Sequence, residues 1–186
     1  MTRPRRLAPA LLRIFALLAV LVGCTGVPAG LEPVRGFDAQ RYLGTWYEIA
    51  RLDHRFERGL DDVTASYAAN ADGSIAVVNR GLDRGQCRWK EARGRAVFLG
   101  PRDRGSLAVT FFWPFAGGYH VFALDERDYG WALVSGPTRD YFWILARRPD
   151  LPEPLRAELV ARARALGFPV QDLILVRHGG SDCPPG

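Results

Sequence analysis

The sequence has few of the residues and motifs from which catalytic or metal sites are built. Its three histidines, His54, His120 and His178, are widely separated and show no metal-ligand spacing. No Gly-x-Ser-x-Gly motif and no phosphate-binding loop occurs. A catalytic thiol would have to be free and activated, and neither Cys87 nor Cys183 lies next to a histidine. We therefore expect no metal, no cofactor and no catalytic residue, and we keep enzymatic activity as a secondary hypothesis.

The sequence also lacks a hydrophobic run long enough to cross a bilayer. The continuous apolar run at residues 14–22 is far shorter than the roughly 20 residues that a spanning helix needs. Arg3, Arg5 and Arg6 precede it, so the N-terminus is typical of a secretory signal rather than of a membrane anchor.

The end of this signal resembles a bacterial lipobox. Residues 21–24 read Leu-Val-Gly-Cys, and in a lipobox the cysteine receives diacylglycerol before the signal is cleaved. We predict a lipoprotein signal peptide at residues 1–23, lipidation of Cys24, and a tether at residues 24–33, which are rich in glycine and proline. The alternative is a plain signal peptide with an incidental cysteine. Because Thr25 rather than aspartate follows the cysteine, the resemblance implies the outer membrane.

An excess of positive charge is absent once the signal is removed. The chain carries a net charge of +5, and residues 1–23 contain four arginines and no acidic residue, so the mature part carries 5 − 4 = +1. The sequence therefore gives no reason to expect a nucleic-acid partner.

Two cysteines remain for the mature chain, Cys87 and Cys183. Outside the cytoplasm an even pair favours a disulfide, and two free thiols are the alternative. Residues 34–186 are long enough for one domain with a sizeable core.

Short strand-like runs separated by turn signals fill most of this domain, and no helix is predicted between them. About eight consecutive strands favour an all-β fold, either an eight-stranded antiparallel up-and-down β-barrel or a sandwich. A closed barrel would remove exposed sheet edges and leave room for one small ligand. The predicted runs are residues 45–52, 63–69, 74–81, 86–93 with 95–99, 106–113, 118–124, 131–135 and 141–147.

One amphipathic helix follows the strands. Leu155, Leu159, Ala163 and Leu166 recur at helical spacing, and Gly167 is a natural C-terminal cap. We expect this helix to pack on the outside of the barrel in a structural role.

Several motifs together resemble the lipocalin family, and more narrowly the bacterial outer-membrane lipocalins. Residues 44–48, Gly-Thr-Trp-Tyr-Glu, match the first family signature. Residues 136–147 match the bacterial branch around the last barrel strand, and residues 54–60 and 111–119 also resemble it. The turn at residues 124–129 departs from the Thr-Asp-Tyr of many lipocalins, so the family's hydrogen bonding cannot be carried over there.

The resemblance implies roles for several residues at the closed end of the barrel and for the cysteines. Arg147 would pack over Trp46 and bind carbonyl groups of the opening turn, with Gly44 beneath, so that these three residues support the architecture. Lipocalins often tie an early-middle strand to the C-terminal tail, and Cys87 and Cys183 occupy such places.

Alternate residues of a barrel strand face inward, so a pocket lining can be proposed from the family pattern. If Trp46 points inward, so do Glu48 and Ala50; on the other strands Thr64, Leu107 and Ala132 are also expected inside. We expect an apolar, aromatic lining suited to an acyl chain. The predicted ligand-binding set is Glu48, Ser66, Val77, Asn79, Val109, Phe111, Tyr119, Val121, Val134, Tyr141 and Trp143.

Glu48 is the most unusual member of this set. A carboxylate inside a barrel is costly unless it is paired or protonated. The sequence allows a structural partner, such as a tyrosine hydroxyl or a buried arginine, or a ligand head group.

The resemblance implies a lipid-anchored, periplasm-facing lipocalin of the bacterial outer membrane. It would bind fatty acids or lysophospholipids without a covalent bond and store or transport lipid for membrane maintenance. A homodimer is possible by resemblance. The alternatives are an isomerase-like lipocalin enzyme acting on a lipophilic substrate and a structural envelope lipoprotein without ligand.

Overall fold

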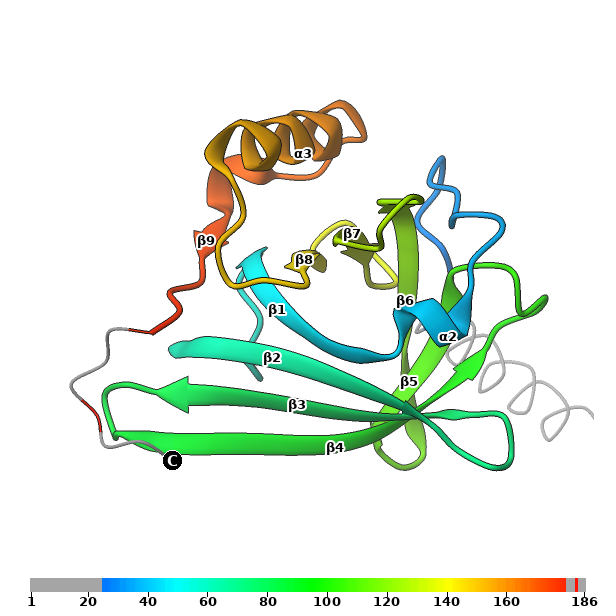
Figure 1. Ribbon diagram of the computed structural model, residues 1–186, viewed down its shortest axis with the longest axis horizontal. Coiled ribbons are helices and arrows are strands. Elements are labelled where there is room, and N and C mark those ends of the chain that lie inside the picture. Colours follow the sequence, from blue (N-terminus) through cyan, green and yellow to red (C-terminus); the bar gives the residue numbers. More distant parts are fainter. Residues whose placement is uncertain (1–24, 180–182, 184–186) are drawn as a thin grey trace, which may run out of the picture.

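The computed structural model describes residues 25–179 and Cys183 (Figure 1). The predicted signal peptide and the lipidation site Cys24 lie outside the described residues. Eight antiparallel strands form a sheet in sequence order that closes through a β1–β2 pairing, and a short ninth strand adds to β1. They are β1 (Gly44–Arg51), β2 (Leu60–Ala69), β3 (Ile75–Asp83), β4 (Arg88–Phe98), β5 (Ser106–Phe112), β6 (Phe115–Leu124), β7 (Trp131–Ser135), β8 (Phe142–Ala146) and β9 (Ile174–Leu175).

The predicted C-terminal helix is present on the outside of the barrel. The helix α3 (Glu153–Ala165) lies outside the barrel, where Leu159 and Ala163 pack with Ile49, Phe122 and other apolar residues of the sheet's outer face (Figure 1). A short helix α2 (Ala39–Tyr42) precedes β1, and a 3-10 turn η1 (Val170–Asp172) precedes β9. The fold is therefore the predicted closed eight-stranded barrel with one C-terminal helix outside. No helix in the described ranges is long and apolar enough to span a membrane.

Trp46 closes one end of the barrel. It is fully buried, and the Arg147 guanidinium lies 4.0 Å from the centre of its ring. Arg147 also donates hydrogen bonds to the carbonyl oxygens of Thr45 (3.0 Å) and Arg41 (2.7 Å). Gly44 adopts a φ of +94°, which L side chains rarely adopt, directly beneath this arginine. The contact that the sequence led us to expect between Arg147 and Trp46 is thus present.

The turn that departs from the family pattern is held by one carboxylate. Asp125 accepts hydrogen bonds from the backbone amides of Arg127, Asp128 and Gly130. The Tyr129 hydroxyl accepts a hydrogen bond from the Asp38 amide at the start of α2. The longer turn therefore still supports the closed end.

The strand β4 is continuous through Gly94, which lies between the predicted runs 86–93 and 95–99 and from the sequence could mark a bulge or bend. Its pairing with β3 runs without a register shift, and a Cβ at Gly94 would lie 2.8 Å from the Phe111 ring. The glycine therefore makes room for an inward-facing aromatic side chain instead of marking a bulge.

Residues 25–33 do not form the free tether that their composition suggested. Leu31 is buried in the outer core cluster, and the His120 ring donates to the Gly26 carbonyl oxygen at 2.9 Å. The next residues are fixed too, because Val34 exchanges backbone hydrogen bonds with Val121 and Gly105. The N-terminal segment is therefore part of the folded domain and runs along the outside of β6.

A disulfide joins Cys87, in the turn between β3 and β4, to Cys183 in the C-terminal tail. The bond links residues 96 positions apart. It holds the C-terminal segment against the β3–β4 end of the sheet, close to the ion pairs that Asp61 makes with Arg84 (2.7 Å) and Arg177 (2.6 Å).

Candidate ligand-binding cavity

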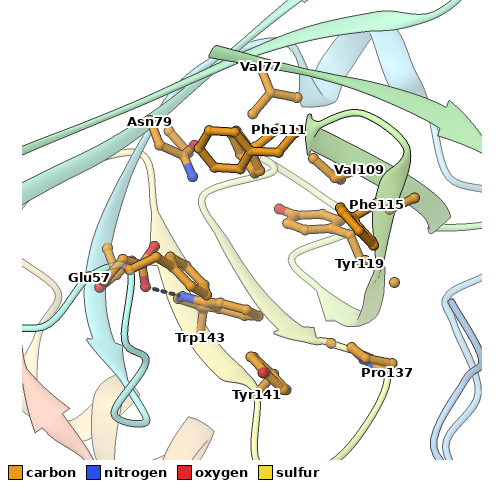
Figure 2. A pocket seen from close by; sticks show the side chains of 18 of the residues that line it. Glu57, Val77, Asn79, Val109, Phe111, Phe115, Tyr119, Pro137, Tyr141 and Trp143 are labelled. Atoms are coloured by element: carbon orange, nitrogen blue, oxygen red, sulfur yellow. Dashed lines mark hydrogen bonds between the residues drawn. The ribbon is translucent and has the colours of Figure 1, made fainter. Parts of the chain in front are cut away.

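The barrel contains a cavity of about 440 Å³ that lies between its strands and opens among its loops (Figure 2). The lining is mainly apolar and aromatic. Eight of the predicted residues line it: Glu48, Val77, Asn79, Val109, Phe111, Tyr119, Tyr141 and Trp143. At its mouth, the loops between β1 and β2 and between β7 and β8 contribute Phe56 and Pro137, and the adjoining ends of β5 and β6 contribute Phe112 and Phe115.

The inward orientation predicted for Ser66 and Thr64 is wrong. Ser66 pairs with Thr45 on β1, and their hydroxyl oxygens lie 3.1 Å apart outside the cavity, which Ala65 and Tyr67 line instead. A register irregularity between Asp61 and Thr64 accompanies this one-residue difference. A slip of one residue reverses the faces of a strand.

The predicted inward orientation of Ala50 is also wrong, because β1 contains a bulge. The β1–β8 register shifts between Glu48 and Ala50, so an extra residue is inserted in β1. Glu48 lines the cavity, whereas Ile49 and Ala50 both belong to the core cluster beneath α3. The bulge then turns the Arg51 side chain toward Glu48.

Val121 and Val134 face the barrel interior but do not line the cavity. Both are fully buried, and they pair directly across β6 and β7. They belong to the packed core around Trp46, together with Leu107 and Ala132. Their predicted role in ligand contact is therefore corrected to core packing at the closed end.

Glu48 has the structural partner that the sequence left open. The Arg51 guanidinium donates to its carboxylate at 2.9 Å, and both side chains are buried. Arg51 also donates to the carbonyl oxygens of Glu57 (2.9 Å) and Leu60 (3.2 Å). One arginine thus links β1 to the loop that precedes β2.

Glu57, which no pattern in the sequence singled out, brings a second buried carboxylate into the cavity. The Trp143 indole donates to Glu57 at 3.0 Å (Figure 2). Glu57 lies in the loop between β1 and β2, where no strand alternation shows which way a side chain points. The resemblance to bacterial lipocalins included residues 54–60 but assigned no role to Glu57.

Burial governs the charge state of both carboxylates. It raises the pKa of Glu48 well above the ordinary value; the nearby Glu57 raises it further, and Arg51 opposes both effects. Burial likewise raises the pKa of Glu57, against the hydrogen bond from Trp143 and the charge of Arg51. Burial therefore favours the protonated form of both carboxyl groups, and Arg51 only partly offsets this effect.

His54 packs beside this cluster and is neutral at pH 7. Its ring stacks on Tyr141 (4.9 Å between centroids) and Phe56 (5.4 Å) and lies 4.7 Å from Trp143. Burial, followed by the charge of Arg51, lowers the pKa of His54 to about 4. The neutral ring therefore packs between aromatic side chains of the β1–β2 loop and of the segment that leads into β8.

Tyr67 and Tyr119 form the polar floor of the cavity, and Tyr42 of the core around Trp46 joins their hydrogen bonds. The Tyr119 hydroxyl lies 2.7 Å from that of Tyr42 and accepts a hydrogen bond from Tyr67 at 2.9 Å. Burial raises the pKa of all three hydroxyl groups, so they stay neutral. Within residues 25–179 and 183, no group of three or more metal-ligating side chains is found that could hold a metal ion.

Comparisons with known proteins agree with this architecture. The family model described as a lipocalin-like domain matches residues 37–178. The chain is 49% identical to "Outer membrane lipoprotein Blc" of Escherichia coli (strain K12) over 166 residues, which cover 89% of this chain and 93% of the relative. It is 45% identical to the protein of the same name in Vibrio cholerae, over 89% of this chain and 98% of the relative.

Among solved structures, insecticyanin from the tobacco hornworm Manduca sexta superposes with a TM-score of 0.67 at 19% identity. That match covers 86% of this chain and 90% of insecticyanin and concerns the fold alone. The matched family model and the bacterial relatives confirm the resemblance seen in the sequence: the chain belongs to the lipocalin family.

Proposed function

We propose that this protein is an outer-membrane lipoprotein that binds a single-chain lipid, a fatty acid or a lysophospholipid, in its barrel. The observation that carries the proposal is the cavity, which is closed at one end by Trp46 and Arg147 and walled by aromatic side chains. Its volume of about 440 Å³ lies within the roughly 300–1,000 Å³ usual for small-molecule sites.

The distribution of polar groups supports an acyl chain with its head group toward the mouth. The floor offers only tyrosine hydroxyls that already bond one another. Val77, Val109 and Phe111 line the apolar middle. An acyl chain placed there would remove its own surface and that of the walls from water, at about 25 cal/mol per Å² of apolar area.

The names of the bacterial relatives and the N-terminal sequence support the proposed location. The relatives are named outer membrane lipoproteins, and residues 21–24 resemble a lipobox. We propose that Cys24 is lipidated and that the barrel faces the periplasm, where it stores or carries lipid for membrane maintenance.

Native mass spectrometry of protein purified without denaturant tests the proposal. We expect a co-purifying species with the mass of a fatty acid or lysophospholipid, and lipid titration of the delipidated protein should change its tryptophan emission. A protein that carries no lipid and binds none on titration would contradict ligand binding and favour a structural envelope protein. Chemical turnover of a bound lipid would instead favour the enzyme hypothesis.

A further inference from the structure

A second hollow lies on the outside of the barrel, on the other side of β1 from the ligand cavity. This outer groove has a volume of about 390 Å³ and crosses β1 to β4, between the loop after β8 and the segment after β9. Tyr47 lines the groove, whereas Glu48, the next residue of β1, lines the cavity. Because consecutive side chains of a strand point to opposite faces, the two sites lie back to back.

The groove contains one arginine that forms no ion pair with any carboxylate of residues 25–179. Arg80 on β3 stacks its guanidinium 3.9 Å from the centre of the Trp89 ring on β4. Glu91 lies opposite Arg80 in the β3–β4 register, but it pairs with Arg93 at 2.8 Å instead. Stacking occupies one face of the guanidinium, and the N–H donors in its plane remain available to a ligand.

The two acidic residues of the groove already have partners of their own. The Asp62 carboxylate pairs with Arg84 at 3.0 Å and accepts a hydrogen bond from the Gly179 amide. Asp150 pairs with Arg148 at 2.7 Å. The positive charge of Arg80 is therefore left without compensation in the groove, which favours a ligand that carries a negative charge.

Neutral groups around this arginine add further donors and flat walls. Tyr47, Thr64 and Arg80 are register neighbours across β1, β2 and β3, so two hydroxyl groups lie in the same row as the guanidinium. The Trp89 indole nitrogen is buried and has no hydrogen-bond partner in the described part of the chain. The His178 ring stands edge-on to Tyr47, 5.5 Å between centroids, and donates to a backbone carbonyl oxygen of β1 at 2.8 Å. The groove thus combines hydrogen-bond donors with aromatic surfaces.

We propose that the outer groove is a second binding site, for a small aromatic carboxylate whose carboxylate binds Arg80 and whose ring packs against the aromatic walls. A guanidinium fork matches the geometry of a carboxylate and forms charge-assisted hydrogen bonds with it. The volume of about 390 Å³ lies within the roughly 300–1,000 Å³ usual for small-molecule sites. Binding in the groove does not depend on a lipid in the barrel.

Nuclear magnetic resonance of the delipidated, nitrogen-15-labelled mature protein tests this site, with 1-naphthoate as the probe. The chain has five tryptophans, so single Trp→Phe variants assign their indole N–H signals. We expect added 1-naphthoate to shift the signal of Trp89 and to leave that of Trp143, in the cavity wall, in place.

Substitution of the arginine tests which group holds the carboxylate. Arg80→Gln should lower the affinity for 1-naphthoate by about tenfold or more, because the charge-assisted hydrogen bonds are lost. The uncharged 1-naphthamide should bind the wild type about as weakly as 1-naphthoate binds this variant. Arg127→Gln is the matched control, since it removes one positive charge from an exposed side chain in the β6–β7 turn and should bind like the wild type.

Three outcomes would overturn the proposal. A shift of the Trp143 signal without one of Trp89 would place the probe in the barrel, and no shift of Trp89 at millimolar probe would mean that the groove does not bind it. Equal affinity of wild type and Arg80→Gln, both folded by circular dichroism, would show that Arg80 does not hold the carboxylate. If Arg80→Gln does not fold, Arg80→Lys replaces it: it keeps the charge without the fork and should bind several-fold more weakly than the wild type, and equal binding would contradict the proposal. Lipid titration of the same samples measures the barrel site separately.

Discussion

At the scale of single residues, Trp143 links the wall of the cavity to its buried charges. It lines the cavity and is the donor to Glu57. We predict that Trp143→Ala weakens lysophospholipid binding by about 1–3 kcal/mol, because the indole no longer covers apolar ligand surface. Titration of the delipidated variant, with circular dichroism to verify the fold, measures the change.

The variant Trp143→Phe distinguishes the contribution of the aromatic wall to ligand affinity from that of the hydrogen bond to Glu57. It keeps most of the aromatic surface and removes the indole N–H that binds Glu57. Its loss of affinity should be smaller than that of Trp143→Ala. Unchanged affinity in a folded Trp143→Ala protein would argue that the ligand does not lie against this wall.

The paired carboxylates make a prediction about pH. Burial raises the pKa of Glu57 in the folded protein, so the folded state binds this proton more tightly than the unfolded state. The free energy of unfolding contributed by Glu57 should therefore fall as pH rises above its unfolded pKa of about 4.3 and through the raised pKa. In Glu57→Gln this decline should be reduced, and the amide oxygen can still accept from Trp143.

Urea unfolding of wild type and Glu57→Gln between pH 4.5 and 8, taken as a difference, measures this effect. The difference is needed because His54 has the opposite slope: its pKa is lowered to about 4, so its contribution is lost as pH falls below its unfolded value of about 6.5. Parallel stability profiles for the two proteins would show that Glu57 does not carry a raised pKa.

At the scale of elements, β2 shows what alternation can and cannot specify. Polar Thr64 and Ser66 alternate with apolar Ala65 and Tyr67, and the apolar pair faces the cavity. The alternation of polar and apolar residues thus agrees with the observed inward face. Alignment to the family pattern shifted the inward positions by one residue. On β1 the bulge after Glu48 interrupts the alternation, and no residue type in the sequence indicates that a bulge forms there.

The disulfide is an element-scale constraint with a measurable effect. It closes a long loop between the β3–β4 turn and the C-terminal tail. We predict that replacing Cys87 and Cys183 together with serine lowers the free energy of unfolding by roughly 2–5 kcal/mol, mainly by freeing the unfolded chain. Urea unfolding of the double variant, compared with oxidised and reduced wild type, measures the loss.

Reduced wild type is the internal control, since it should match the double variant. Two reactive thiols in denatured, unreduced mature protein would contradict the bond. A double variant as stable as the oxidised wild type would show that the ion pairs of Asp61 with Arg84 and Arg177 suffice to hold the tail.

At the scale of the whole molecule, closure of the barrel was predictable and the interior chemistry only partly so. Strand number, turn signals and one late helix favour a barrel or a sandwich with a helix outside, because each is a local property of the sequence. The family resemblance then selected the closed barrel. The Glu48–Arg51–Glu57 cluster and its partner Trp143 depend on a bulge and on a loop, because their residues come from β1, β8 and the loop between β1 and β2. The packing of residues 25–33 was missed because their composition resembles a linker, while the contacts that fix them come from β6 and its neighbours.

At the same scale, the proposed lipid anchor leads to a prediction about membrane attachment. We expect Cys24→Ser to lose acylation and leave the membrane fraction after salt and carbonate washes. A lipoprotein cysteine carries several acyl chains, whereas a single myristoyl chain binds a membrane only marginally. Thr25→Ser, one residue away, should stay membrane-bound and serves as the matched control. Fractionation with immunoblotting measures the membrane-bound share of both variants. A Cys24→Ser protein that stays in the membrane fraction after the washes would show that attachment does not depend on this cysteine.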